Sequence, residues 1–164
     1  MTLIASEPIR DDAEIPALPL WLGLLGLIPF IGLALAIALH GRDLFGLDAA
    51  AALLGYGATI LSFLGGAHWG LALRHPNAET RRGLSVGAMA PPLWAWGALL
   101  VGGASGLFML GAGLAAHGIV DGLWSTRFAA PRWYGRLRLL LAALATIATV
   151  AAGAVIASQQ IWVS

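Results

Sequence analysis

Three ionisable residues lie within long apolar segments of this sequence: His68, His117 and Asp121. A histidine ring can donate or accept a hydrogen bond or bind a metal, and a carboxylate can pair with either ring, so the trio could transfer protons, hold an ion or join helices. His117 and Asp121 are four residues apart and share one face of a helix. Because ionisable groups in a bilayer are costly, they mark a functional or assembly site by default. We therefore treat the three residues as one candidate polar cluster.

Interhelical hydrogen bonding is the expected use of this cluster. Asp121 lies about one turn from the end of its apolar segment, and each histidine can bond to a backbone carbonyl of a neighbouring helix. A proton or ion relay is a second use, but it needs a matching polar site in the other half of the membrane. The sequence offers little there besides Thr59, Ser62 and Ser105. The cluster alone therefore does not predict transport.

Metal and cofactor binding are further alternatives. His68 and His117 at one depth on two helices would suit paired axial ligation of haem. Two histidines and one carboxylate without a characteristic spacing make a poor zinc signature. We expect no metal and no cofactor, and we keep haem at His68 and His117 as the alternative.

The composition determines the medium around these residues. Of 164 residues, 59% are hydrophobic and 10% are charged, whereas a soluble domain has about 25% charged residues. A bilayer core about 30 Å thick is crossed by about 20 helical residues. The long apolar runs lack the alternation of barrel strands, and open strands would leave unpaired amides in hydrocarbon. The predicted fold class is all-α, a polytopic membrane helical bundle with five transmembrane helices.

The chain divides into a polar tail at residues 1–16 and a transmembrane domain at residues 17–164. Pro29 predicts a bend in the first span, and the adjacent Pro91 and Pro92 predict a break near the centre of the third. The five spans are expected at residues 18–39, 49–73, 84–101, 107–124 and 137–157.

Arginine distribution predicts the topology. Eight of the nine arginines fall in the amino tail, the second loop and the fourth loop, whereas the other side of the membrane has only Arg42. The positive-inside rule therefore predicts the N-terminus inside and the C-terminus outside.

His68 and His117 are expected at similar depths in the membrane. They precede the inner ends of their spans by about five and seven residues, which places the two rings within roughly 3 Å of each other in depth. Side chains expected to reach Asp121 from the inner loops are those of Arg74, Arg127 and Arg132. Trp94 and Trp96 lie too deep for an interfacial aromatic belt.

Small residues recur at helical spacing in the second and fourth spans and predict close helix packing. Packing within one chain is the expected use, and contact between two copies is the alternative. The residues are Ser62, Gly65, Gly66, Gly70, Gly111, Ala115, Gly118 and Gly122.

Several classes of function are disfavoured. The absence of cysteine removes disulfides and thiolate chemistry. No glycine-rich segment follows a strand or carries a phosphate-binding lysine, and a net charge of +1 argues against nucleic acid. The buried Ser and His residues do not assemble a nucleophile, base and oxyanion donors, so we expect no enzyme. The nine basic residues are all arginine, without any lysine, and Ala and Gly are abundant. This composition suggests a bacterial protein, which we expect in the inner (cytoplasmic) membrane.

Residues 61–70, LSFLGGAHWG, resemble the signature of the transmembrane-protein-69-like family, in which a Leu-Ser-Phe-Leu-Gly-Gly run precedes Trp-Gly. The resemblance extends in layout to five spans and a proline-rich third helix. It implies a small integral inner-membrane protein and supplies no reaction, substrate or catalytic residue.

The expected function is that of a non-catalytic accessory or assembly subunit of a larger membrane complex, such as a respiratory complex. Its expected partners are the lipid bilayer and a membrane protein or a second copy of the chain. Small size, short loops and small-residue faces favour this function. A small proton-coupled transporter, based on the broken third helix and Asp121, and a haem- or porphyrin-binding protein are the alternatives.

Overall fold

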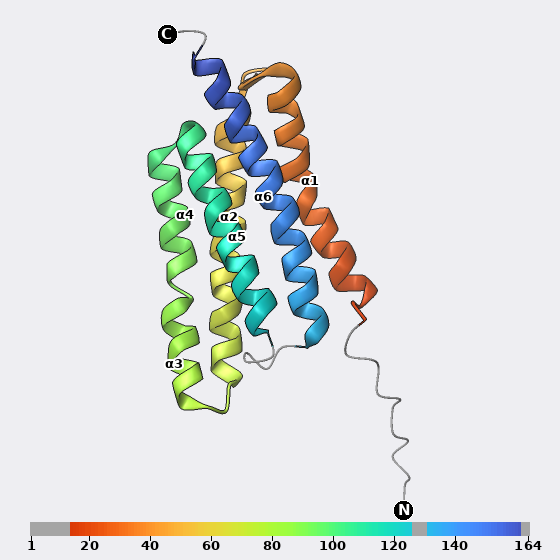
Figure 1. Cartoon of the computed structure of the whole chain (residues 1–164), viewed down its shortest axis with the longest axis vertical. Coiled ribbons are helices and arrows are strands. Elements are labelled where there is room, and N and C mark those ends of the chain that lie inside the picture. The colour runs from red at the N-terminus through yellow and green to blue at the C-terminus, as the bar shows by residue number, and fades with distance from the viewer. Residues whose placement is uncertain (1–13, 126–130, 162–164) are drawn as a thin grey trace, which may run out of the picture.

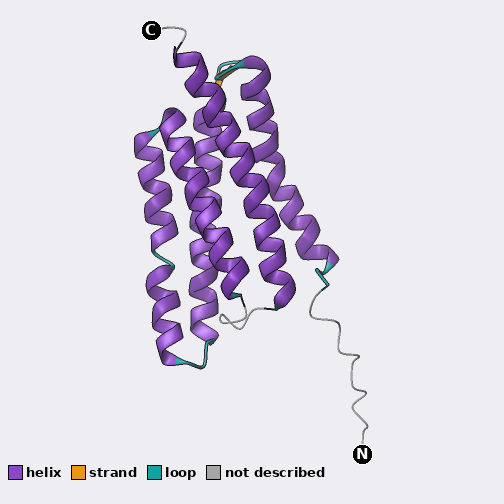
Figure 2. Ribbon diagram, in the orientation of Figure 1, coloured by secondary structure: helices purple, strands orange, loops and turns teal. Residues whose placement is uncertain are grey.

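The computed structural model describes residues 14–125 and 131–161, which form a bundle of long, roughly aligned helices (Figures 1 and 2). The elements in chain order are α1 (Ala17–His40), β1 (Asp43–Leu44), β2 (Leu47–Asp48), α2 (Ala49–Arg74), α3 (Ala78–Gly87), α4 (Ala90–Val101), α5 (Gly103–Trp124) and α6 (Arg132–Ile161).

Five helical segments of the described chain are long and apolar enough to cross a membrane. Their bounds are Ala17–His40, Ala49–Leu73, Ala78–Val101, Gly103–Trp124 and Arg132–Gln159. Each lies close to an expected span, and the last three begin earlier in the chain than the sequence predicted. The protein is therefore a multi-pass helical membrane protein in which loops take up little of the chain.

The third crossing is made of two helices, α3 and α4, separated by Ala88 and Met89. The break precedes Pro91 and Pro92 and does not lie between them, because both prolines occupy the first turn of α4. Proline is tolerated there, since the amides of a first turn have no intrahelical partner. The crossing begins at Ala78 and not near Leu84, so the preceding loop is shorter than predicted.

Helix α1 continues through Pro29 from Ala17 to His40. Figure 1 shows it changing direction along its length, in the manner that an internal proline produces. The hydroxyl of Tyr56 on α2 donates to the Gly26 carbonyl at 2.8 Å, close to the site where the proline removes a backbone hydrogen bond. This contact ties the two helices together at the bend.

The connection between α1 and α2 is a short hairpin, in which Asp43 pairs with Asp48 across two-residue strands. Phe45 and Gly46 in its turn have φ of 53° and 86°. The Asp48 carboxylate accepts from Ala51 N–H at 2.9 Å and so caps α2. Hydrogen bonding from the Arg42 guanidinium, at 2.7 Å, is the main cause that lowers the pKa of this carboxyl.

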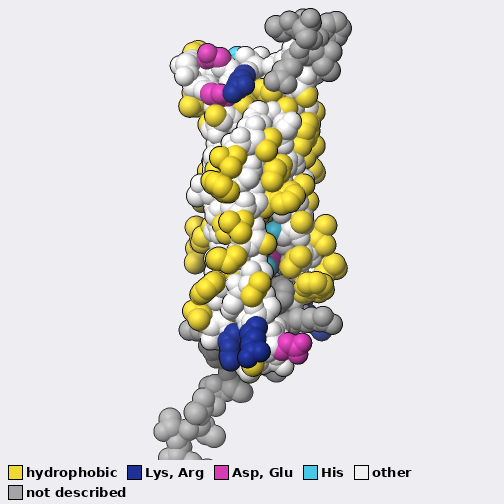
Figure 3. All heavy atoms as spheres, turned by 90° about the vertical axis from the view of Figure 1, so that its left-hand side faces the viewer, with side chains coloured by type: hydrophobic (Ala, Val, Ile, Leu, Met, Phe, Trp, Pro, Cys, Tyr) yellow, Lys and Arg dark blue, Asp and Glu magenta, His cyan; other side chains and the backbone are white. Residues whose placement is uncertain are grey.

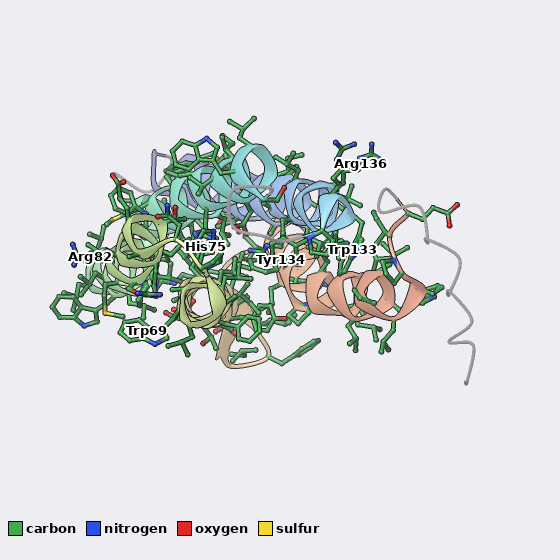
Figure 4. All side chains as sticks on the ribbon, turned by 90° about the horizontal axis from the view of Figure 1, so that it is seen from below. Trp69, His75, Arg82, Trp133, Tyr134 and Arg136 are labelled. Carbon is green, nitrogen blue, oxygen red and sulfur yellow. The ribbon has the colours of Figure 1, made fainter. Side chains whose placement is uncertain are left out.

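The end of the bundle opposite this hairpin carries exposed arginines, and Figure 3 shows a patch of their side chains there; they are Arg81, Arg82, Arg132 and Arg136. Seen from that end, Arg82 and Arg136 lie on different sides of the bundle, with Trp69, Trp133 and Tyr134 also at this end (Figure 4). The two ends of the bundle therefore differ in charge, as the sequence predicts.

Candidate functional site

Asp121 is the centre of a buried ionic cluster that joins three helices. Its carboxylate, on α5, is completely buried. One oxygen lies 2.5 Å from Nε2 of His68 on α2, and the other accepts from Nε of Arg138 on α6 at 2.7 Å. The carboxylate is thus paired on both oxygens, which is the condition under which a buried charge is tolerated.

Among the residues that the structure describes, the cation on Asp121 is Arg138, which is not one of the three arginines expected from the sequence; of those three, the side chain of Arg74 lies outside the described part of the chain. Arg132 lies at the exposed start of α6, and Arg127 lies outside the described residues. Arg138 lies in the second turn of α6, which begins at Arg132, about one and a half turns earlier than the predicted span. Its guanidinium also lies 6.0 Å from the Tyr134 ring centroid.

Glycines allow α5 and α6 to approach closely enough for this contact. A Cβ on Gly118 would overlap the methyl group of Ala142, and a Cβ on Gly111 would lie 2.8 Å from the Val150 side chain. Arg138 is one helical turn before Ala142 and faces the same seam. The close approach of the two backbones therefore positions the guanidinium.

Gly122 likewise has no room for a side chain, because a Cβ there would overlap Leu139, and a Cβ on Gly65 would lie 2.5 Å from the Ala88 carbonyl oxygen. Ser62 is half-buried and donates to the Ala58 carbonyl at 2.8 Å, and Ala115 is half-buried. Gly66 and Gly70 differ, because nothing lies within 4 Å of a Cβ at either position. Within the described part of the chain, no other segment packs closely against these two glycines.

His117 lies directly beside the ionic cluster. Its ring is 4.5 Å from the ring of His68, centroid to centroid, and it hydrogen-bonds to the backbone of Leu64. Its Nε2 is buried without a hydrogen-bond partner, 3.8 Å from the Asp121 carboxylate, and Nη2 of Arg138 is also buried without one. The cluster predicted from sequence is thus assembled in space, with Arg138 as a fourth member.

The geometry constrains what the cluster can bind. One ligand atom from each of His68, His117 and Asp121 can be chosen so that all lie within 4.8 Å of one another, a spacing compatible with a metal ion. The guanidinium of Arg138 already occupies the carboxylate, and a second positive charge beside it would be repelled. The two rings lie at stacking distance, which leaves no room for a porphyrin between them. The arrangement therefore suits a fixed interhelical ion pair better than metal or haem.

Three threonine hydroxyls of the described helices donate to backbone carbonyls. Thr59 donates to the Gly55 carbonyl, and Thr149 to the Ala145 carbonyl. Thr146 donates to Gly111 across the α5–α6 seam, at 3.5 Å. Each hydroxyl hydrogen is thus committed to a backbone carbonyl.

The two histidines also form part of the wall of a large groove. A cavity of about 1020 Å³ lies between α2, α3, α4 and α5. Figure 3 shows this side of the bundle as largely hydrophobic, with histidine atoms visible inside a gap in the surface. The lining residues are Leu61, His68, Thr80, Gly83, Leu84, Gly87, Ala90, Pro91, Trp94, Ala112, Gly113, Ala116, His117, Val120 and Trp124.

Sequence reasoning did not find this groove. The signal available was Trp94, which lies too deep for an interfacial belt. Its indole donates to the Met109 carbonyl at 2.6 Å, and Gly113 makes room for it, because a Cβ there would lie 2.5 Å from the indole. Small lining residues such as Gly83 and Ala116 leave the space open, but their common face is defined only once the helices are packed.

Comparison with known proteins supplies the family. Residues 15–154 match the profile of a family described as protein of unknown function, DUF3429. The chain belongs to this family. The chain is also similar to transmembrane protein 69 of Xenopus tropicalis, which is 36% identical over 144 residues, covering 85% of this chain and 54% of that protein. The chain thus spans about half the length of this relative. No solved structure matches it. The resemblance found at residues 61–70 is confirmed.

Proposed function

We propose that this DUF3429 protein is a non-catalytic membrane protein that binds a lipophilic molecule in the groove between α2 and α5. The observation that supports this function is the groove itself, with a volume of about 1020 Å³ and a mainly apolar lining. Ligand pockets typically measure about 300–1,000 Å³ and combine apolar walls with a few polar groups. In this groove His68 and His117 are the two ionisable lining residues.

The polar cluster has a supporting role in this proposal. Asp121 and Arg138 neutralise each other and hold α5, α6 and α2 in place through His68. A ligand site on rigid, mutually fixed helices loses less entropy when it binds its ligand. The same pairing occupies both oxygens of Asp121, the one buried carboxylate among the described residues, which is why we propose binding and not catalysis.

The direct test is to purify the protein from its native host in mild detergent and analyse the co-purifying lipophilic molecules by mass spectrometry. One dominant species near equimolar amount is expected. The double variant Ala112→Leu/Ala116→Leu, which fills the groove from two exposed lining positions, should lose it. Ala151→Leu, an exposed position on α6 outside the groove, is the matched control and should retain it. Equal occupancy in all three proteins would refute the proposal.

A role as an accessory or assembly subunit of a larger membrane complex is the second candidate. It is favoured by Gly66 and Gly70, which form an outward-facing small-xxx-small pair with nothing within 4 Å of either Cβ position. Such a pair lets a helix of a partner, or of a second copy, approach closely. Gly66→Leu/Gly70→Leu should abolish co-purification of a partner or homo-oligomer from native membranes, and an unchanged complex would exclude this surface.

For location and orientation we propose a bacterial inner membrane with the arginine-rich end of the bundle in the cytoplasm. Five crossings then place the two termini on opposite sides. The support is the charge difference between the bundle ends, with Arg81, Arg82, Arg132 and Arg136 exposed at one and Arg42 at the other.

A further inference from the structure

We infer that the ligand of the groove is an anionic phospholipid, with one acyl chain between α2, α4 and α5 and its phosphate at the arginine-bearing end of α3. This inference rests on the proposed function and specifies its ligand. Three features carry it: the hydrogen-bonding state of the groove wall, the extent of the groove along the helices, and the charge at one end.

The groove wall presents mainly apolar surface and few available hydrogen-bonding groups. His68 is bonded to Asp121, and the unpartnered Nε2 of His117 is itself buried and faces the carboxylate. The indole N–H of Trp94 is committed to Met109. These three lining side chains thus direct the named polar atoms into the protein, and a wall of that kind complements an apolar chain better than a carbonyl-rich ring.

The groove is about as long as one membrane leaflet. Along α5 it extends from Ala112 to Trp124, a rise of about 18 Å of helix. Half of a hydrocarbon core is about 15 Å. Thr80 lines the groove near the beginning of α3, at the arginine-rich end, so the groove begins at a membrane surface and ends near the middle of the bilayer.

Exposed arginines that are not part of the groove wall lie beside its Thr80 end. Arg81 and Arg82 lie between the lining residues Thr80 and Gly83 and are exposed. Arg81 donates to the His75 carbonyl at 3.3 Å, and Arg82 extends outward at this end of the bundle (Figure 4). With Glu79 in the first turn, α3 retains one excess positive charge. Guanidinium groups at this height favour phosphate through charge-assisted hydrogen bonds.

The test is native mass spectrometry of the full chain in mild detergent, titrated with phosphatidylglycerol or with phosphatidylcholine of the same acyl chains. One molecule of phosphatidylglycerol is expected to bind at least about fivefold more tightly than phosphatidylcholine, because each arginine near the surface contributes about that factor. Arg81→Gln/Arg82→Gln should remove the preference without removing chain binding. Arg132→Gln, an exposed arginine on α6, is the matched control and should keep it.

Filling the groove separates this inference from the proposed function. Ala116→Leu should weaken binding of both lipids, and Ala151→Leu should weaken neither. If the two lipids bind equally, or if the arginine variants keep the preference, the anionic ligand is wrong while a lipophilic ligand stands. If Ala116→Leu binds both lipids as wild type does, the groove is not the site and the proposed function fails with it.

Discussion

Replacing Asp121 by Asn should be the most destabilising single change in the polar cluster. The carboxylate is completely buried and bonded on both oxygens, at 2.5 Å to His68 and at 2.7 Å to Arg138. Asparagine keeps the volume but removes the charge, so Arg138, whose side chain is 13% exposed, is left without its counter-ion. Removing one partner of a buried ion pair costs about 3–5 kcal/mol.

The size of this effect distinguishes an ion pair from ordinary packing. Arg138→Met alone should also destabilise, because it leaves Asp121 with only the neighbouring imidazoles. The double variant Asp121→Asn/Arg138→Met should be more stable than the sum of the single changes predicts, since neither charge then remains buried. Arg132→Gln on the same helix is the control and should change the unfolding free energy by less than about 0.5 kcal/mol.

Reversible unfolding in mixed detergent micelles, followed by far-UV circular dichroism, measures these differences. A loss below about 1 kcal/mol for Asp121→Asn would be the range of surface pairs. That result, or strict additivity of the two single variants, would refute the assignment of Asp121 and Arg138 as a buried pair. It would also remove the argument that this ion pair fixes the helices around the proposed ligand site.

Three further predictions follow from other parts of the fold. Gly118→Ala should destabilise by about 1–3 kcal/mol through overlap with Ala142, whereas Gly66→Ala, with open space around it, should be neutral in the isolated protein by the same unfolding assay. Asp48→Ala should lower the free energy of unfolding by about 1 kcal/mol through loss of the helix cap. Because Arg42 lowers the Asp48 pKa, the stabilisation by Asp48 is complete above the carboxyl's ordinary pKa and is lost as pH falls through the lower pKa of the folded state. The unfolding free energies of variant and wild type should therefore converge in acid. A phosphatase fused to the C-terminus should be active outside the cytoplasm and a fluorescent protein there dark; the opposite pattern would invert the topology.

The helical class and the positions of the crossings could be predicted because each depends on local composition. A run of about 20 apolar residues has to satisfy its backbone internally, and a helix does so without reference to the rest of the chain. The errors lie at helix ends. The sequence predicted the break of the third crossing at Pro91 and Pro92. Because proline fits the first turn of a helix, both prolines lie inside α4 and the observed break lies just before them, at Ala88 and Met89.

The candidate site was only partly predictable for a related reason. The depths of His68 and His117 follow from counting residues to the end of each span, and the structure brings their rings to 4.5 Å. The partner of Asp121 depends on which face of α6 meets α5, and charge gives no information about that face. The spacing of Arg138 and Ala142 on one side of α6, opposite Gly118, was the usable signal.

The sequence by itself determined that lipid surrounds most of this protein, the number of its membrane crossings and the charge difference between its ends. These properties depend on the apolar residues and arginines of local segments. Only the tertiary structure decided that Arg138 is the counter-ion, that Gly66 and Gly70 face outward and that a groove lies beside the two histidines. Those features depend on the rotation and closest approach of neighbouring helices, which arise from side-chain packing between segments far apart in the chain.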